Sequence, residues 1–170
     1  MLPLMVVNDT SVEIPPKIQT REVVRAIMIA DGKILLMFSN RDQMYGTPGG
    51  GITLGESKLD TLYRELLEEV GAQKIKIIEN IGSTEEIRLS RSLLKPMKIL
   101  TDYYHVEVLD FADSSLEEHE EDMGLEPMWV LIDEAIKRNE MQLDFLRPSN
   151  ITFYYTQTKM LKYIKDRFGL

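Results

Sequence analysis

GGITLGESKLDTLYRELLEEVGA, residues 50–72, contains the signals for a glycine loop followed by one capped helix. Ser57 is a suitable N-cap residue, and Asp60 three positions later approximates its partner in a capping box. Gly71 suits the left-handed backbone position that ends many helices. The sequence therefore predicts a helix from about Lys58 to Val70.

The helical repeat divides this predicted helix into two faces. Apolar residues at spacings of three, four and four form a stripe for packing against a sheet, namely Leu59, Leu62, Leu66 and Val70. A second stripe, turned by roughly 100° on a helix of about 3.6 residues per turn, contains Glu65, Glu68 and Glu69. One face is thus expected to pack, and the neighbouring face is acidic.

The acidic face costs local stability. Glu65 and Glu69 form a like-charge i,i+4 pair that is unfavourable by roughly 0.2–0.5 kcal/mol. Glu68 and Glu69 also lie near the negative end of the helix dipole, at about 0.3–1 kcal/mol each when exposed, and Arg64 offsets only part of this. Mg²⁺ would remove the conflict, because it prefers carboxylate oxygens and keeps other positions for water and substrate phosphate. The stretch therefore predicts a metal site, and the alternative is an acidic face exposed to solvent.

The segment also fits a longer pattern, G-x5-E-x7-R-E-U-x-E-E-x-G-U, in which U is an apolar residue. The matching residues are Gly50, Glu56, Arg64, Glu65, Leu66, Glu68, Glu69, Gly71 and Ala72. This segment resembles the Nudix box, the signature of the Nudix hydrolase family. With a chance of about one in fifteen at each fixed position, a chain of this length would match about once in a million. Ala72 is smaller than the aliphatic residue that the family usually carries there.

The resemblance extends beyond the box. Pro48 and Gly49 precede it as in many members of the family, and the stretch from Trp129 to Ala135 is similar to a common W-V-x-x-x-E-A ending. The resemblance implies an α/β fold, the Nudix-type α/β/α sandwich with a mixed sheet and a loop-helix-loop metal site. It also implies a hydrolase, dependent on Mg²⁺ or Mn²⁺, that cleaves the pyrophosphate linkage of a nucleoside diphosphate joined to another group.

The family's residue roles carry over to the matching positions. By resemblance, the metal cluster consists of Glu65, Glu68, Glu69 and the Gly49 carbonyl, with Glu56 supporting it from the loop. Arg64 is expected to orient a helix glutamate through a charge-assisted hydrogen bond. The general base is expected to be either a glutamate of the box, such as Glu68, or one from a later loop. The loop candidate is Glu120, and its rivals are Glu117, Glu118 and Glu121.

Residues outside the box provide candidates for substrate contacts. Aromatic residues that could stack on a base are Tyr45, Phe38 and Tyr103 or Tyr104, although an aromatic residue on a strand usually belongs to the core. Basic residues that could reach phosphates are Arg41, Arg88 and Arg91, with a solvated surface position as the alternative for each.

The substrate itself stays open at the level of sequence. None of the subfamily signatures that would name it is evident, so nucleoside triphosphates, oxidised nucleotides and ADP-ribose are all candidates. The alternative function is a nucleotide-binding or sensing Nudix module that does not cleave its ligand. A third alternative is a structural protein with an acidic helix.

The composition of the chain sets the broad class. With 170 residues, 44% hydrophobic and 28% charged, it suits one domain, expected at residues 21–170 behind an N-terminal extension of residues 1–20. The start, MLPLMVV, lacks the features of a secretory signal, and no apolar run is long enough to span a membrane, so a cytoplasmic location is expected. The absence of cysteine excludes thiolate metal sites, and a metal ion is expected to be held by oxygen ligands.

The net charge of the chain and the resemblance to the family indicate which binding partners to expect. A net charge of −8 argues against binding a nucleic acid polymer, whereas a small nucleotide can approach as its Mg²⁺ complex. Because family members often dimerise, a homodimer is left open.

Secondary structure along the rest of the chain follows from local patterns. Residues 1–20 are expected to add an edge strand or an oligomer contact. VVRAIMIA and KILLMF, from residue 23, flank Asp31-Gly32 and predict a hairpin. KIKIIENIGS, EEIRLS, ILTDYYHVEVL and MWVLI predict strands, and DSSLEEHEEDMGLEP predicts a loop. DEAIKRN predicts a short helix, and residues 150–168 predict a longer one with Phe153, Met160, Ile164 and Phe168 near one face.

Overall fold

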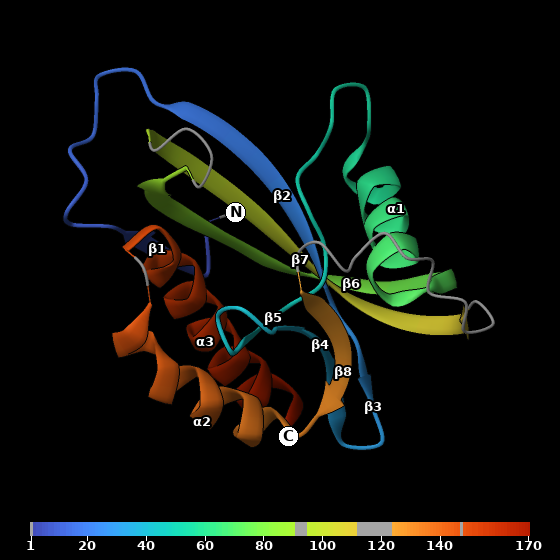
Figure 1. Cartoon of the computed structure of the whole chain (residues 1–170). Coiled ribbons are helices and arrows are strands. Elements are labelled where there is room, and N and C mark those ends of the chain that lie inside the picture. The colour runs from blue at the N-terminus through green and yellow to red at the C-terminus, as the bar shows by residue number, and fades with distance from the viewer. Residues whose placement is uncertain (1, 91–94, 112–123, 147) are drawn as a thin grey trace.

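The computed structural model describes residues 2–90, 95–111, 124–146 and 148–170. Figure 1 labels its helices and strands along the chain. In chain order these elements are β1 (Met5–Asn8), β2 (Gln19–Ile27), β3 (Ile29–Ala30), β4 (Lys33–Ser39), β5 (Met44–Gly46), α1 (Lys58–Val70), β6 (Ala72–Leu89), β7 (Pro96–Phe111), β8 (Leu125–Val130), α2 (Ile132–Gln142), the 3-10 helix η1 (Leu143–Phe145) and α3 (Pro148–Phe168).

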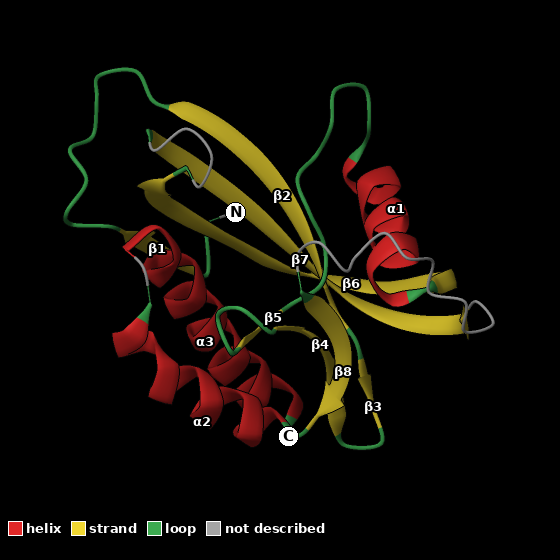
Figure 2. Ribbon diagram, viewed as in Figure 1, coloured by secondary structure: helices red, strands yellow, loops and turns green. Residues whose placement is uncertain are grey.

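The strands form two sheets, drawn in yellow in Figure 2. The first has the order β1-β6-β7-β2 and is mixed, because β6 and β7 are antiparallel while β1 and β2 run parallel to their neighbours. The second is antiparallel, with the order β3-β4-β5 and with β8 paired to β4. Helix α1 lies on one side of the sheets, and α2 and α3 lie together on the other (Figure 1). The predicted α/β fold with a mixed sheet is therefore confirmed.

Two hydrophobic clusters hold the helices against the sheets. The first joins α1 to β2 and β6, and it contains the fully buried Leu62 and Leu66 together with Val24. The second joins α2 and α3 to the other side, and it contains Met160 and Ile164 on the face predicted for the last helix. Each helix thus buries one stripe, as an amphipathic helix does when it covers a sheet.

Helix α1 begins and ends where the sequence predicts. The Ser57–Asp60 capping box is complete, and Gly71 has the left-handed φ of 69°. The predicted apolar stripe is wrong at Leu59, which is 41% exposed. Thr61 is fully buried instead, because its hydroxyl donates a hydrogen bond of 2.8 Å to Glu56 Oε2 in the preceding loop. The first turn of the helix is therefore fixed by polar contacts with the loop.

The predicted hairpin around Asp31-Gly32 exists, but its first arm is short. Asp31 and Gly32 have φ values of 49° and 71°, the positive values that a two-residue hairpin turn needs. Only β3 precedes this turn in the second sheet, since β2 ends at Ile27 and pairs with β7 in the first. The run of apolar residues is buried on both faces around Met28, so its pattern gives no sign that the chain changes sheets there.

The two strands predicted after α1 are one long strand, β6. Gly82, with a φ of 139°, stands at an irregularity in the pairing of β6 with β7 and leaves the strand continuous. A side chain at Gly82 would meet Leu4, since an added Cβ would lie 2.8 Å from its Cγ. The glycine therefore marks a bulge beneath the N-terminal segment, where the sequence suggested a break.

The first strand, the last strand and the last two helices are all present, and one of them begins earlier than predicted. Strand β1 lies at the edge of the first sheet, parallel to β6, so the predicted edge strand is present. Strand β8 begins at Leu125, earlier than predicted, because Leu125 to Pro127 pair with Ser39 to Met37 of β4. Helices α2 and α3 occupy their predicted places. Among the described residues, no helix combines the length and the apolar composition needed to cross a membrane.

Candidate metal and substrate site

The fold brings the glycine loop and the glutamates of α1 together. The amide nitrogen of Gly49 donates a hydrogen bond of 2.6 Å to Glu69 Oε2. The carboxylate of Glu65 lies against Gly50, where an added Cβ would be only 2.3 Å from Oε1. Gly49 has a φ of 124°, and its own Cβ would lie 2.2 Å from the Val24 carbonyl oxygen. Gly49 is therefore required by the backbone, whereas the glycine at position 50 leaves room for the Glu65 carboxylate.

The glycine loop is fixed along the edge of β2. The amides of Val24 and Ala26 donate hydrogen bonds of 3.0 and 2.9 Å to the carbonyls of Gly50 and Pro48. The Gly49 carbonyl takes no part in this pairing. The loop is thus attached to β2 on one side and to a helix carboxylate on the other, which sets the distance between the strand and α1.

Arg64 connects the loop to the acidic face of the helix. Its Nε and Nη2 donate hydrogen bonds of 2.8 and 3.0 Å to the two carboxylate oxygens of Glu56. Its Nη1 donates to Glu65 Oε1 at 2.8 Å and to Glu68 Oε2 at 3.1 Å. This network, with Thr53 and Thr61 adding hydrogen bonds to Glu56, holds the pKa of that carboxyl well below its ordinary value. The pKa of Arg64 is raised in turn, chiefly by Glu56.

The donor atoms around the loop fit a hard divalent cation. Glu65 and Glu69, one helical turn apart, both place carboxylates at the glycine loop. Glu68 is 56% exposed at its side chain and faces Arg64. Among the described residues, no three acidic or histidine side chains form a preassembled ligand set. That arrangement still suits Mg²⁺, which commonly binds one or two protein carboxylates and takes its other ligands from water and substrate phosphate.

Several predicted residues lie away from this cluster. Arg41 is exposed and pairs with the adjacent Asp42 at 3.2 Å. Tyr45 packs against Phe38, with 4.9 Å between ring centroids, and its amide donates to Asn139. Tyr103 and Tyr104 are buried in the core, which is the alternative considered for aromatic residues on strands. The remaining candidates, Arg91, Glu117, Glu118, Glu120 and Glu121, lie outside the described residues.

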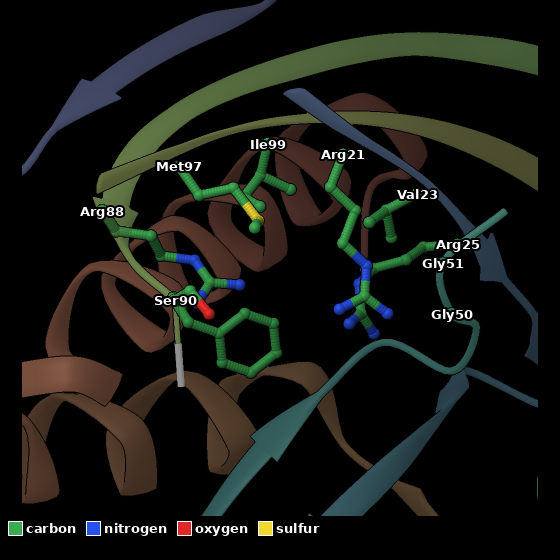
Figure 3. A pocket seen from close by; sticks show the side chains of 10 residues that line it. Arg21, Val23, Arg25, Gly50, Gly51, Arg88, Ser90, Met97 and Ile99 are labelled. Carbon is green, nitrogen blue, oxygen red and sulfur yellow. The ribbon is translucent and has the colours of Figure 1, made fainter. Parts of the chain in front are cut away.

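A pocket of about 340 Å³ lies beside the glycine loop. Gly50 and Gly51 form part of its wall (Figure 3). Arg21 and Arg25 of β2 line it, together with Arg88 of β6. Among the described residues that the sequence offers as substrate contacts, Arg88 alone lines the pocket. The others lie outside its lining, namely Phe38, Arg41, Tyr45, Tyr103 and Tyr104.

Two arginines of the pocket stack on the same aromatic ring. The guanidinium carbons of Arg25 and Arg88 lie 5.1 and 5.7 Å from the ring centroid of Phe153 on α3. Sequence reasoning placed Phe153 on the core face of its helix and missed Arg21 and Arg25. The period-two alternation of Arg21, Val23 and Arg25 was the available signal, because it puts all three side chains on one face of a strand.

Comparisons with known proteins identify the family of this chain. The family model of the NUDIX domain matches residues 19–151. No curated protein matches the chain. Among solved structures, the chain is similar to the E. coli ORF135 protein, with 28% identity, a TM-score of 0.51 and coverage of 85% of this chain and 92% of that chain.

Two further solved structures share the fold at lower identity. A UDP-X diphosphatase has 19% identity and a TM-score of 0.52, with 79% of this chain and 68% of that chain covered. A MutT protein from Bacillus halodurans has 21% identity and a TM-score of 0.51, with 83% and 82% covered. Because the family model spans most of the sequence, the chain belongs to the NUDIX family and is a Nudix hydrolase, an enzyme that acts on phosphorus-containing anhydrides.

Proposed function

We propose that this Nudix hydrolase cleaves the pyrophosphate linkage of a small nucleoside diphosphate derivative, with Mg²⁺ or Mn²⁺ at the junction of the glycine loop and α1. The observation that carries the proposal is the meeting of Glu65 and Glu69 with the loop at Gly49 and Gly50. These carboxylates would otherwise repel each other at i,i+4 spacing. A cation between them and a substrate phosphate explains why the chain keeps both.

These contacts support a proposed set of metal-holding residues. Glu65, Glu69 and the Gly49 carbonyl are the proposed ligands, with Glu68 completing the acidic set of the helix. When bound, the ion neutralises charge on the phosphoryl oxygens. Arg64 is a positioning residue, because it holds Glu65 and Glu68 by hydrogen bonds. Glu56 acts through Arg64, whose guanidinium it binds with both carboxylate oxygens.

The bond change is a hydrolysis. Water attacks one phosphorus, a new P–O bond forms, and the bridging P–O bond breaks with its electron pair leaving on the departing phosphate. A carboxylate takes the proton of the attacking water. Glu68 is one proposal for this base, since its side chain is 56% exposed beside the cluster. Glu120, outside the described residues, is the competing proposal.

A substrate panel tests the proposed function. The wild-type protein is incubated with Mg²⁺ and nucleoside triphosphates, an oxidised nucleoside triphosphate, ADP-ribose or a UDP-sugar, and released monophosphate is measured. The UDP-sugar is included because one structural relative is a UDP-X diphosphatase. Turnover of at least one member is expected. Replacing Glu69 with Gln should abolish that turnover without unfolding the protein, and Glu107→Gln, an exposed residue of β7 that pairs with Lys76, is the matched control.

A lack of turnover in the substrate panel would contradict the proposed function. If the metal-loaded protein turns over no member, hydrolysis of these nucleotides is refuted, and binding without turnover would indicate the non-catalytic sensing module. Near-normal activity of Glu69→Gln would remove Glu69 from the ligand set. A homodimer, a cytoplasmic location and a domain boundary at residues 20 and 21 stay predictions alongside this proposal.

A further inference from the structure

The pocket beside the glycine loop is positively charged, although the chain as a whole is acidic. Arg21, Arg25 and Arg88 line it, and no described lining residue is acidic. Figure 3 shows Arg88 entering from one side and Arg21 with Arg25 from the other. The chain as a whole has a net charge of −8. The clustering of three guanidinium groups is therefore a local feature of this pocket.

The protein compensates only part of this charge within the described residues. Arg88 pairs with Glu86 at 3.2 Å, and Glu86 is only 2% exposed. Arg25 donates to the neutral carbonyl of Thr47 and stacks on Phe153. The guanidinium group of Arg21 has no hydrogen bond or ion pair with any described residue, although it lies so close to the loop that a Cβ on Gly51 would meet its Nη2 at 2.4 Å. Arg21 and Arg25, which have no carboxylate partner among the described residues, therefore give the pocket its excess positive charge.

The chemistry of guanidinium groups defines what fits this excess. They are donors only and cannot lose their charge in proteins, so they favour a group that offers only acceptors. Carboxylate and phosphate groups meet that need, because two of their oxygens can accept parallel hydrogen bonds from one planar guanidinium and because they carry a compensating negative charge. The volume of about 340 Å³ is within the usual range for part of a small ligand. An amino or hydroxyl group would leave the charges uncompensated.

We infer that the pocket binds an anionic group of the substrate that lies outside the pyrophosphate linkage, so that the preferred substrates are nucleoside diphosphate derivatives with an additional carboxylate or phosphate. The inference rests on the proposed function. Its location supports this, because Gly50 lines the pocket and also contacts Glu65 of the metal cluster. The glycine loop thus separates the pocket from the cluster, and a substrate with its pyrophosphate at the cluster would lie next to the pocket.

Binding of matched ligands, measured by calorimetry in EDTA, tests the inference without relying on turnover. UDP-glucuronate and UDP-glucose differ by one carboxylate, and 2′-phospho-ADP-ribose and ADP-ribose differ by one phosphate. In at least one pair the more anionic member should bind about tenfold or more tightly, the effect of one charge-assisted interaction. The pair that shows the preference identifies the carboxylate or the phosphate as the group recognised.

Substitutions then assign the preference to the pocket. Arg21→Met keeps a long side chain, removes a guanidinium that has no described partner, and should reduce the affinity ratio within the pair to near one. Arg25→Met is the second variant and should act in the same direction. Arg167→Met is the matched control, since Arg167 is a partly exposed residue of α3 that pairs with Glu79 and lies outside the pocket lining. Its affinity ratio should equal that of the wild type.

The outcomes separate this inference from the proposed function. Equal affinities within both pairs, no measurable binding of either anionic member, or a preference that survives in both Arg21→Met and Arg25→Met would overturn the anionic pocket. Turnover with Mg²⁺ is measured separately on the same ligands. Hydrolysis without a preference for the anionic ligand would support the proposed function and refute only the inference about the pocket. Preferential binding without hydrolysis would support the anionic pocket and refute the proposed hydrolysis of these ligands.

Discussion

Gly50→Ala is expected to damage the reaction while leaving the fold almost unchanged. The new Cβ would lie 2.3 Å from Glu65 Oε1, whereas ordinary contact begins at 3.4 Å, so the carboxylate must move by about 1.1 Å. Glu65 is the flexible end of a side chain and can make this shift. Gly50 is not among the residues with positive φ, so its backbone accepts alanine without strain.

The size of the effect follows from that displacement. The hydrogen bond of 2.8 Å between Arg64 Nη1 and Glu65 Oε1 would be stretched or lost, and the carboxylate would leave the glycine loop. A misplacement of about 1 Å in a catalytic arrangement costs about 10²-fold in rate. Losing this part-buried hydrogen bond costs about 0.5–1.5 kcal/mol, which corresponds to a fall in Tm of about 6 °C or less for a chain of this size.

Two neighbouring glycines provide the controls for kcat and Tm measurements. Gly49→Ala places its Cβ 2.2 Å from a backbone oxygen at a φ of 124°, and it should lower Tm strongly. Gly55→Ala meets nothing within 4 Å at a φ of 91°, so it should cost stability through strain alone and keep its activity. Wild-type kcat in Gly50→Ala, or a loss of Tm as large as that of Gly49→Ala, would refute the reasoning about Glu65.

Three further predictions concern stability. Arg64 lowers the pKa of Glu56, so their pairing stabilises the fold fully above the ordinary pKa of 4.5 and less as the pH falls toward the lowered pKa. Glu56→Gln should therefore have a lower Tm than the wild type at pH 7. A difference in Tm that stays unchanged in acid would contradict this prediction. Burial raises the pKa of Tyr103 to about 12, so the folded state should lose on the order of 2–3 kcal/mol relative to the unfolded chain between pH 10 and 12, and Tyr103→Phe should be less sensitive to alkali in denaturant titrations. Mg²⁺ at about 100 times its Kd should stabilise the wild type by about 2.7 kcal/mol in thermal melts, and an equal gain in Glu65→Gln would argue against Glu65 as a ligand.

The parts of the molecule that sequence predicts well are those determined by neighbours in the chain. The capping box, the left-handed Gly71 and the bounds of α1 depend on contacts within a few residues, so spacing alone reveals them. The proximity of the glycine loop to the helix glutamates follows from the same short segment. Leu59 was mispredicted because its exposure depends on how the loop before the helix folds back, which a helical repeat does not describe.

The pocket escaped prediction because its residues come from distant parts of the chain. Arg21 and Arg25 meet Arg88 through the pairing of β2, β7 and β6, and Phe153 arrives from the last helix. Each of these residues alone has a simpler explanation as surface or core. The change of sheet after β2 could not be predicted either, because a strand buried on both faces lacks the alternation of apolar and polar residues that shows which face packs on the core.

Strand β2 contributes to the core, to the pocket and to the attachment of the glycine loop, and this limits which mutations the strand tolerates. Its inward residues Val24 and Ala26 belong to the core under α1, its alternate residues Arg21 and Arg25 line the pocket, and its backbone holds the glycine loop. Exchanging a pocket arginine alters one of these surfaces and leaves the other two intact. Inserting a single residue would turn the arginines into the apolar core and shift the loop pairing together. Descendants of this sequence can thus acquire new substrates by point substitutions on β2, whereas insertions or deletions within the strand should be eliminated by selection.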